Sequence, residues 1–153
     1  MDPSNNGLTT MALIGDGYVG KTCILKCLQK SSYQQNSSPN VYNEMTLEKT
    51  DIFLLCFCVA DTVSYENVTS KWVPDLQHYR SKPIILLGTK VDLRSSSSST
   101  SISRHRGIRL QKRIGAKSYV ECSSKSGQGI SNIIDVASNV LLTSENRKTC
   151  TLQ

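Results

Sequence analysis

Eight consecutive residues have the types and the spacing of a loop that binds phosphate. They match the pattern G-x-x-x-x-G-K-[ST] and are Gly15, Asp16, Gly17, Tyr18, Val19, Gly20, Lys21 and Thr22. Glycines let the backbone curl, with its N–H groups pointing at an anion that lies too close for side chains. Lys21 can then reach the β- and γ-phosphates, while the Thr22 hydroxyl can bind Mg²⁺. The alternative is an ordinary glycine-rich turn between a strand and a helix.

The segments on either side of this loop have the expected character. A short apolar run predicts a strand over 9–14, and apolar residues at helical spacing predict a helix over 21–29. A helix that begins at the loop adds the positive end of its dipole to the anion site. The sequence therefore predicts phosphate binding at the junction of the first strand and the first helix.

A second candidate motif, Thr89-Lys90-Val91-Asp92, follows the apolar run from Pro83 to Gly88. Ligands of open α/β sheets bind beyond the C-terminal ends of strands, so this motif and the phosphate loop can face one ligand. A carboxylate at Asp92 can accept hydrogen bonds from N1–H and the 2-amino group of guanine, a donor pair that adenine lacks. The Lys90 stem can cover the face of the base. The alternative is simply a polar end to a strand.

A third polar loop runs from Glu121 to Lys125, after an expected short strand over 118–122. Its residues suit the O6 atom of guanine. Further elements are expected as a continuous apolar strand over 51–59 and helices over 64–79, 103–114 and 130–141. Strands that alternate with helices predict an α/β fold with a doubly wound, mostly parallel sheet.

Length and composition favour one globular domain. With 153 residues and 38% hydrophobic content, the chain suits a domain over 1–143 followed by a flexible tail over 144–153. The longest apolar run is too short to span a membrane, and the N-terminus lacks a signal-peptide core. The six cysteines show no metal or disulfide pattern, which predicts a cytoplasmic protein.

The net charge of +6 is concentrated in the expected helix over 103–114 and the residues just after it. Six cations fall there: Arg104, Arg106, Arg109, Lys112, Arg113 and Lys117. The simpler interpretation is a solvated helix face, and the other is a surface that attracts anionic lipid or an acidic partner. No aromatic residue interleaves the cations, so nucleic acid is not expected as a partner.

Together these segments resemble a Rho-family small GTPase over nearly the whole chain. The resemblance rests on the phosphate loop followed by Cys23, the run Phe53–Val59, the segment Glu66–Pro74, Gly88–Arg94 and Tyr119–Ser123. It implies a P-loop fold that binds GTP or GDP with Mg²⁺, with Gly15 to Cys23 around the phosphates. It also places a set of residues around guanine: Tyr33, Thr89, Lys90, Asp92, Leu93, Ser123, Ser124 and Lys125.

The last four residues, Cys150 to Gln153, fit the C-a-a-X pattern for prenylation of Cys150, with Gln favouring farnesyl. A prenylated chain would be a peripheral membrane protein on the cytoplasmic face of the plasma membrane. One lipid chain binds membranes weakly, so a second signal is expected to be needed.

The sequence departs from the family pattern between the first helix and the second long strand. A Thr of the first switch is replaced by Asn40, whose amide oxygen could still reach Mg²⁺. The family's second and third strands are largely missing, and no D-x-x-G occurs anywhere in the chain. The missing segment holds Mg²⁺, senses the γ-phosphate and orients the attacking water, so we expect impaired GTP hydrolysis. The first strand is also expected to become an unprotected edge, with Thr46–Glu48 as a short substitute.

The leading hypothesis is a membrane-associated signalling GTPase, linked to the actin cytoskeleton by the resemblance alone. It would interact with Rho-type regulators and effectors. A second hypothesis is a non-catalytic interaction protein that competes for those regulators or effectors. A third is a shortened product that does not fold stably.

Overall fold

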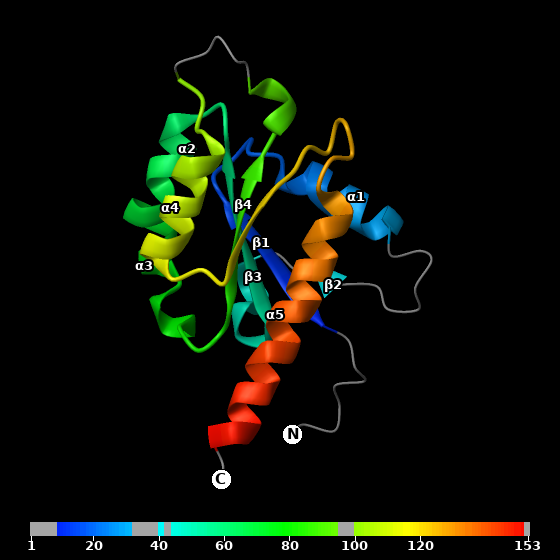
Figure 1. The fold of residues 1–153 in the computed structure, drawn as a ribbon, viewed down its shortest axis with the longest axis vertical. Coiled ribbons are helices and arrows are strands. Elements are labelled where there is room, and N and C mark those ends of the chain that lie inside the picture. The colour runs from blue at the N-terminus through cyan, green and yellow to red at the C-terminus, as the bar shows by residue number, and fades with distance from the viewer. Residues whose placement is uncertain (1–8, 32–39, 42–43, 95–99, 152–153) are drawn as a thin grey trace.

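The computed structural model describes residues 9–31, 40–41, 44–94 and 100–151 and shows a parallel sheet between two layers of helices (Figure 1). Side chains are described for 9–30, 47–94 and 100–145. The sheet order is β2-β1-β3-β4-β5, and each neighbouring pair is parallel. The strands are β1 (Thr10–Gly15), β2 (Asn40–Val41), β3 (Ile52–Cys58), β4 (Ile84–Thr89) and β5 (Ser118–Glu121).

The central strand, β3, forms the middle of the core. Every residue from Ile52 to Cys58 is buried, which agrees with the prediction that an apolar run without alternation lies inside a parallel sheet. Its side chains alternate between two apolar clusters, one on each face, with Leu54 in the first and Phe53 in the second. The sheet is therefore covered on both sides.

The helices divide between these two faces (Figure 1). Helices α1 (Lys21–Ser31) and α5 (Ile130–Thr151) cover one face, with Leu28 and Ile133 in its core cluster. The other face is covered by α2 (Thr62–Asn67), α3 (Val73–Asp75) and α4 (Arg104–Ile114). This arrangement confirms the predicted doubly wound α/β fold.

Helix α4 has the predicted bounds. The Ser103 hydroxyl accepts a hydrogen bond from the Arg106 N–H at 3.2 Å, as a helix-capping serine should. Gly115 ends the helix in the left-handed conformation at φ 74°. A serine cap and a glycine end therefore fix the two ends of this helix.

The single helix expected over 64–79 is wrong in detail. Helix α2 begins earlier, with the Asp61 carboxylate accepting from the Val63 N–H, and a π-helix follows over Val68–Trp72. Short α3 and a 3₁₀ turn over Gln77–Tyr79 complete the segment. Pro74 has no N–H to donate and its ring is incompatible with a regular helical turn, so the chain changes helix type around it.

The first strand is not an uncovered edge. Two residues of β2 pair with Thr10 and Met11, so only the later part of β1 lacks a strand on that side among the described residues. The suggestion that Thr46–Glu48 forms a substitute strand is also wrong, because Glu44–Lys49 is a 3₁₀ helix. Beyond it, the Asp51 carboxylate accepts a hydrogen bond from the Thr10 N–H at 2.8 Å. This bond fixes the segment that leads into β3 to the start of β1.

The C-terminal part of the chain also differs from expectation. A flexible tail was expected from residue 144, whereas α5 continues as a helix to Thr151. Cys150 lies within the helical backbone, and its side chain is outside the described residues. No helix in the described part of the chain is long and apolar enough to cross a membrane.

Candidate functional site

The predicted phosphate and guanine motifs meet at one edge of the sheet. Strands β1, β4 and β5 are parallel, so the loops that follow Gly15, Thr89 and Glu121 leave the sheet at the same end. The Thr89 hydroxyl, buried in this junction, donates a hydrogen bond to the Val19 carbonyl at 2.6 Å. The Lys90 ammonium group donates to the Tyr18 carbonyl at 2.7 Å. Two motifs separated by about seventy residues therefore touch each other.

The phosphate loop has a backbone that requires glycine where it leaves the sheet. Gly15 has a φ of 150°, and a Cβ there would lie 2.4 Å from the Cys56 carbonyl oxygen. Gly20 has a φ of 97°, which L-residues also rarely adopt. Tyr18 adopts a φ of 66° and is 99% exposed, so its ring lies outside the loop. Side-chain bulk is thus kept away from the inner turn of the loop.

The side chain of Lys21 folds back onto the backbone of the phosphate loop. Its ammonium group donates to the Asp16 carbonyl at 3.1 Å and to the Gly15 carbonyl. Helix α1 begins at Lys21 and has no acidic residue in its first turn. A cation and a helix N-terminus at one loop are the features that favour an anion.

The site offers Mg²⁺ a hydroxyl. Thr22 and Cys23 are exposed in the first turn of α1. Among the described residues, no group of three His, Cys, Asp or Glu side chains is arranged to hold a metal ion. Mg²⁺ keeps several water ligands and is commonly bound through few protein groups plus substrate phosphates. The residues present fit that mode, with Thr22 as the protein ligand. Asn40 lies in β2, and its side chain is outside the described residues.

The carboxylate of Asp16 connects the phosphate loop to the opposite helical layer, a link that motif reasoning missed. The Trp72 indole N–H donates to one carboxylate oxygen at 2.7 Å, and the Asn67 amide donates to the other at 2.6 Å. Lys71 lies over the Trp72 ring at 4.3 Å. The only sequence signal was a single tryptophan in a helix with few other large apolar residues.

The base-side loops are joined by their own hydrogen bonds. The Ser123 hydroxyl donates to the Asp92 carboxylate at 2.6 Å, and the Val91 N–H donates to the Cys122 carbonyl at 3.2 Å. Lys90 adopts the left-handed conformation at φ 56°, which turns the chain after β4. The structure therefore brings the predicted Asp92 and Ser123 together.

The remaining predicted guanine residues lie around this pair or outside the described chain. Ser123 is fully buried, while Asp92, Leu93 and Lys125 are exposed. The Ser124 carbonyl accepts a weak bond from the thiol of Cys27 at 3.8 Å. Tyr33 lies outside the described residues.

A charged network that the sequence analysis did not assign supports these two loops. Arg94 forms a two-bond ion pair with Glu121, at 2.6 and 2.9 Å, and also donates to the Ile102 carbonyl at 2.8 Å. The Tyr119 hydroxyl donates to Glu121 at 2.8 Å. Arg94 follows the Thr89–Asp92 motif and Glu121 precedes the Ser123 loop, so the pair fixes one loop to the other. Both residues stand beside recognised motifs, which is the signal that could have found them.

The electrostatics of the network follow from burial and pairing. Burial alone would raise the pKa of Glu121, but hydrogen bonds from Arg94 and Tyr119 and the nearby arginine charges hold it below its ordinary value. The hydrogen bond to Glu121 raises the pKa of Arg94, and burial is the main cause that raises the pKa of Tyr119. Burial also raises the pKa of the Cys122 thiol to about 12. The carboxylate is thus held ionised and the neighbouring thiol neutral.

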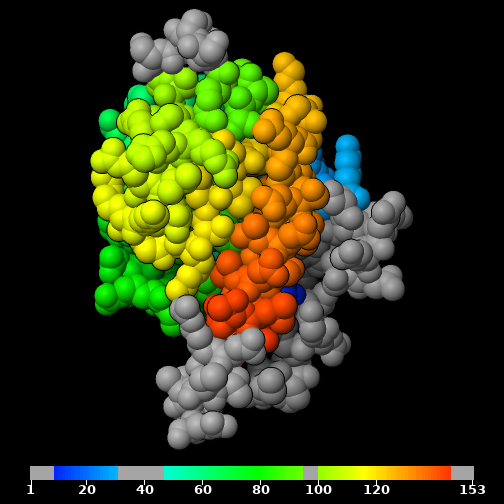
Figure 2. Space-filling model, in the orientation of Figure 1, coloured from blue at the N-terminus to red at the C-terminus, as the bar shows by residue number. Residues whose placement is uncertain are grey.

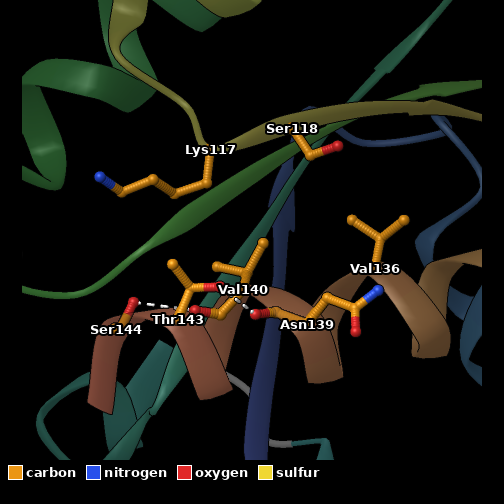
Figure 3. A pocket seen from close by; sticks show the side chains of 7 residues that line it. All are labelled: Lys117, Ser118, Val136, Asn139, Val140, Thr143 and Ser144. Atoms are coloured by element: carbon orange, nitrogen blue, oxygen red, sulfur yellow. Dashed lines mark hydrogen bonds between the residues drawn. The ribbon is translucent and has the colours of Figure 1, made fainter. Parts of the chain in front are cut away.

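A hollow of about 360 Å³ elsewhere in the molecule is not part of this site (Figure 3). It lies between α5 and the start of β5, so it adjoins the sheet end opposite the phosphate loop. The Thr143 and Ser144 hydroxyls beside it donate to carbonyls of their own helix, at 2.8 and 2.9 Å. These two hydroxyls are therefore already used within the helix.

Comparison with known protein families identifies a family for this chain. Residues 40–142, which are more than half of the chain, match the family model of the Ras family. The chain belongs to the Ras family. Ras-family proteins are small GTPases, and as a group they bind GTP and GDP with Mg²⁺. The match covers both base-side loops and begins after the phosphate loop, so the loop motif is independent support.

Proposed function

We propose that this Ras-family protein binds GTP or GDP with Mg²⁺ at the C-terminal edge of its sheet. The observation that supports this most is the direct contact between the two motifs, through Thr89 to the Val19 carbonyl and Lys90 to the Tyr18 carbonyl. One nucleotide can span both motifs because they share an edge and touch. The phosphates would lie in the loop from Gly15 to Thr22, and the base between the loops of Asp92 and Ser123.

Each group has a distinct role in the proposed complex. Lys21 neutralises phosphate charge, and its present hydrogen bonds to loop carbonyls would be exchanged for phosphate oxygens. Thr22 would hold Mg²⁺, which supplies charge neutralisation between the phosphates when bound. The Asp92 carboxylate, oriented by Ser123, would accept from the guanine N1–H and 2-amino groups.

The binding proposal is tested by a GDP titration followed through the emission of Trp72, the only tryptophan in the chain. Asp92→Ala is expected to weaken GDP binding by at least a hundredfold and to remove the preference over ADP. Asp75→Ala is the matched control, because Asp75 is also an exposed carboxylate but belongs to α3. Equal GDP affinity in the unaltered protein and in Asp92→Ala would contradict the proposal.

We further propose that hydrolysis is impaired. The chain has no D-x-x-G segment, so it lacks the carboxylate, amide and glutamine that such a segment contributes to metal binding and water orientation. A single-turnover assay with bound GTP is expected to give a rate far below that of an intact Rho-family GTPase. A rate equal to that of the intact enzyme would rule this out.

We also propose a Rho-like role and attachment to the membrane. Both proposals rest on the resemblance of nearly the whole chain to Rho-family proteins and on the Cys150-Thr-Leu-Gln ending. The expected role is signalling at the cytoplasmic face of the plasma membrane, through Rho-type regulators and effectors. Cys150→Ser is expected to move the protein from the membrane fraction to the soluble fraction of cells. An unchanged distribution would exclude the prenyl anchor.

The missing switch segment also favours a second candidate, a non-catalytic protein that competes for the regulators of intact relatives. Lys21→Ala separates the two candidates, because it removes phosphate binding and leaves the outer helical surface in place. Capture of a Rho-type regulator should survive Lys21→Ala under the second candidate and be lost under the first. A thermal melt shifted upward by GDP and Mg²⁺ supports the first candidate, and a melt without shift supports the second.

A further inference from the structure

A groove lined by cations runs between α2 and α4, on the face of the sheet opposite α1 and α5. Its volume is about 510 Å³, and it is lined by Tyr65, Arg106, Arg109, Leu110, Lys112 and Arg113. Helix α4 lies on the face shown at the left of Figure 2, and its four cations that line the groove are exposed. None of the residues named as nucleotide-binding above lines this groove.

The groove has a defined floor and a fixed wall. Leu110 is 1% exposed and forms the apolar floor. Tyr65 packs edge-on against Phe57, with ring centres 5.3 Å apart, and its hydroxyl donates to the Arg106 carbonyl at 3.2 Å. The Arg106 guanidinium group lies over the Tyr65 ring at 4.9 Å. One cation of the groove is therefore held in place by an aromatic ring.

The three arginines of the groove follow one face of α4. Arg106, Arg109, Leu110 and Arg113 are spaced three, one and three residues apart, which places them on a single helical stripe. Arg94 and Arg104 form ion pairs with Glu121, whereas the four groove cations form no ion pair with a carboxylate among the described residues. No carboxylate lines the groove.

Helix stability accounts for only part of this placement. Cations stabilise the C-terminal turn of a helix, which explains Lys112 and Arg113. Arg106 lies near the N-terminal end, where the helix dipole disfavours a positive charge. Four like charges within eight residues also repel one another, and an anion bound in the groove would relieve that repulsion.

We propose that this groove docks an acidic segment of a partner protein. A segment with carboxylates about one helical turn apart would match the stripe of arginines, and an apolar side chain between them would cover Leu110. A recessed groove with cations on its rim admits a narrow chain between its walls, whereas a flat bilayer would reach only the rim. An acidic peptide is therefore favoured over an anionic membrane.

The test uses the full chain and a fluorescein-labelled peptide, Glu-Glu-Leu-Glu-Glu-Leu-Glu, followed by fluorescence anisotropy. The variant is Arg106→Gln/Arg109→Gln/Arg113→Gln, which changes only exposed side chains. The control is Lys26→Gln/Lys30→Gln/Lys49→Gln, which removes the same charge from exposed positions outside the groove. Peptide affinity is expected to fall on the order of tenfold in the groove variant and to change less than about twofold in the control.

Two outcomes of this comparison would overturn the proposal. Equal losses of peptide affinity in the groove variant and the control variant would show that net charge alone attracts the peptide. Unchanged peptide affinity in the groove variant, with lost binding to vesicles of phosphatidylcholine and phosphatidylserine, would assign the groove to membranes.

A second measurement uses the unaltered protein, so it does not depend on whether a variant folds. Added peptide should slow amide hydrogen exchange in 62–67 and 104–114, and protection confined to other segments would also contradict the proposal.

Discussion

The two halves of the proposed nucleotide site are held in shape by different means. The phosphate half depends on backbone conformation, because Gly15 lies where no Cβ fits and Gly20 has a positive φ. The base half depends on side chains, since the ion pair of Arg94 with Glu121 joins its two loops. A consensus pattern records the first kind of constraint well, since glycines are conspicuous in a sequence. It records the second poorly, because partners such as Arg94 and Glu121 lie far apart in the chain.

The strongest test of the backbone-dependent half is Gly15→Ala. The new methyl group would meet the Cys56 carbonyl at 2.4 Å in a backbone conformation that alanine avoids. We expect the free energy of unfolding to fall by about 3 kcal/mol, with loss of GDP binding. Urea denaturation and a GDP titration measure the two effects.

Gly17→Ala is the matched control for stability. A Cβ at Gly17 would meet nothing within 4 Å, and this residue does not have a positive φ. Its unfolding free energy should change by less than about 0.5 kcal/mol. If Gly15→Ala and Gly17→Ala were equally stable, the loop would not depend on its backbone as described.

The side-chain-dependent half is tested by Arg94→Met. The Arg94 side chain is 27% exposed and that of Glu121 is 9% exposed, so the substitution leaves a largely buried carboxylate without its main partner. We expect a loss of about 2 kcal/mol in unfolding free energy, together with weaker GDP binding. Arg104→Met is the control, because Arg104 is 63% exposed and lies 3.6 Å from Glu121. A loss as large in the control would mean that net charge, and not the ion pair, supports the loops.

The link between the phosphate loop and the helical layer is tested by a double-mutant cycle of Trp72→Phe and Asp16→Asn. The indole N–H donates to a carboxylate at 2.7 Å, and both residues are half-buried. We expect a coupling energy of about 1 kcal/mol from urea denaturation of the four proteins. Additive effects of the two substitutions would show that the hydrogen bond does not couple loop and helix.

The smallest expected effect is a change with pH in the stability that Glu121 contributes to the base half of the site. The pKa of Glu121 is lower in the folded state than its ordinary value of 4.5. The ionised form therefore stabilises the fold fully above that value, and this contribution is lost as the pH falls through the lower folded-state pKa. The stability difference between the unaltered protein and Glu121→Gln should be constant above about pH 5 and shrink in more acidic solution. A difference that grows in acid would contradict the assigned pKa direction.

Patterns of residue type and spacing predicted the layers of this fold and the location of the candidate site. Continuous apolar runs predicted β3 and β4, and the alternation of strands with helices predicted the parallel sheet. These features depend on local chemistry, which a sequence displays directly. The π-helix before Pro74 and the pairing of β2 with β1 depend on tertiary competition for hydrogen bonds, so periodicity could not reveal them. The Asp16–Trp72 bond likewise joins residues that only the folded chain brings together.

The length of α5 fixes where its far end lies relative to the rest of the molecule. The helix begins at Ile130, just after the loop of Ser123, and its 22 residues extend for about 33 Å toward the other end of the sheet (Figure 1). A group attached near Thr151 would thus be separated from the proposed nucleotide by nearly the whole height of the protein. If that group were held at a surface, the helix would act as a rigid spacer that points the nucleotide-binding end outward, toward soluble proteins.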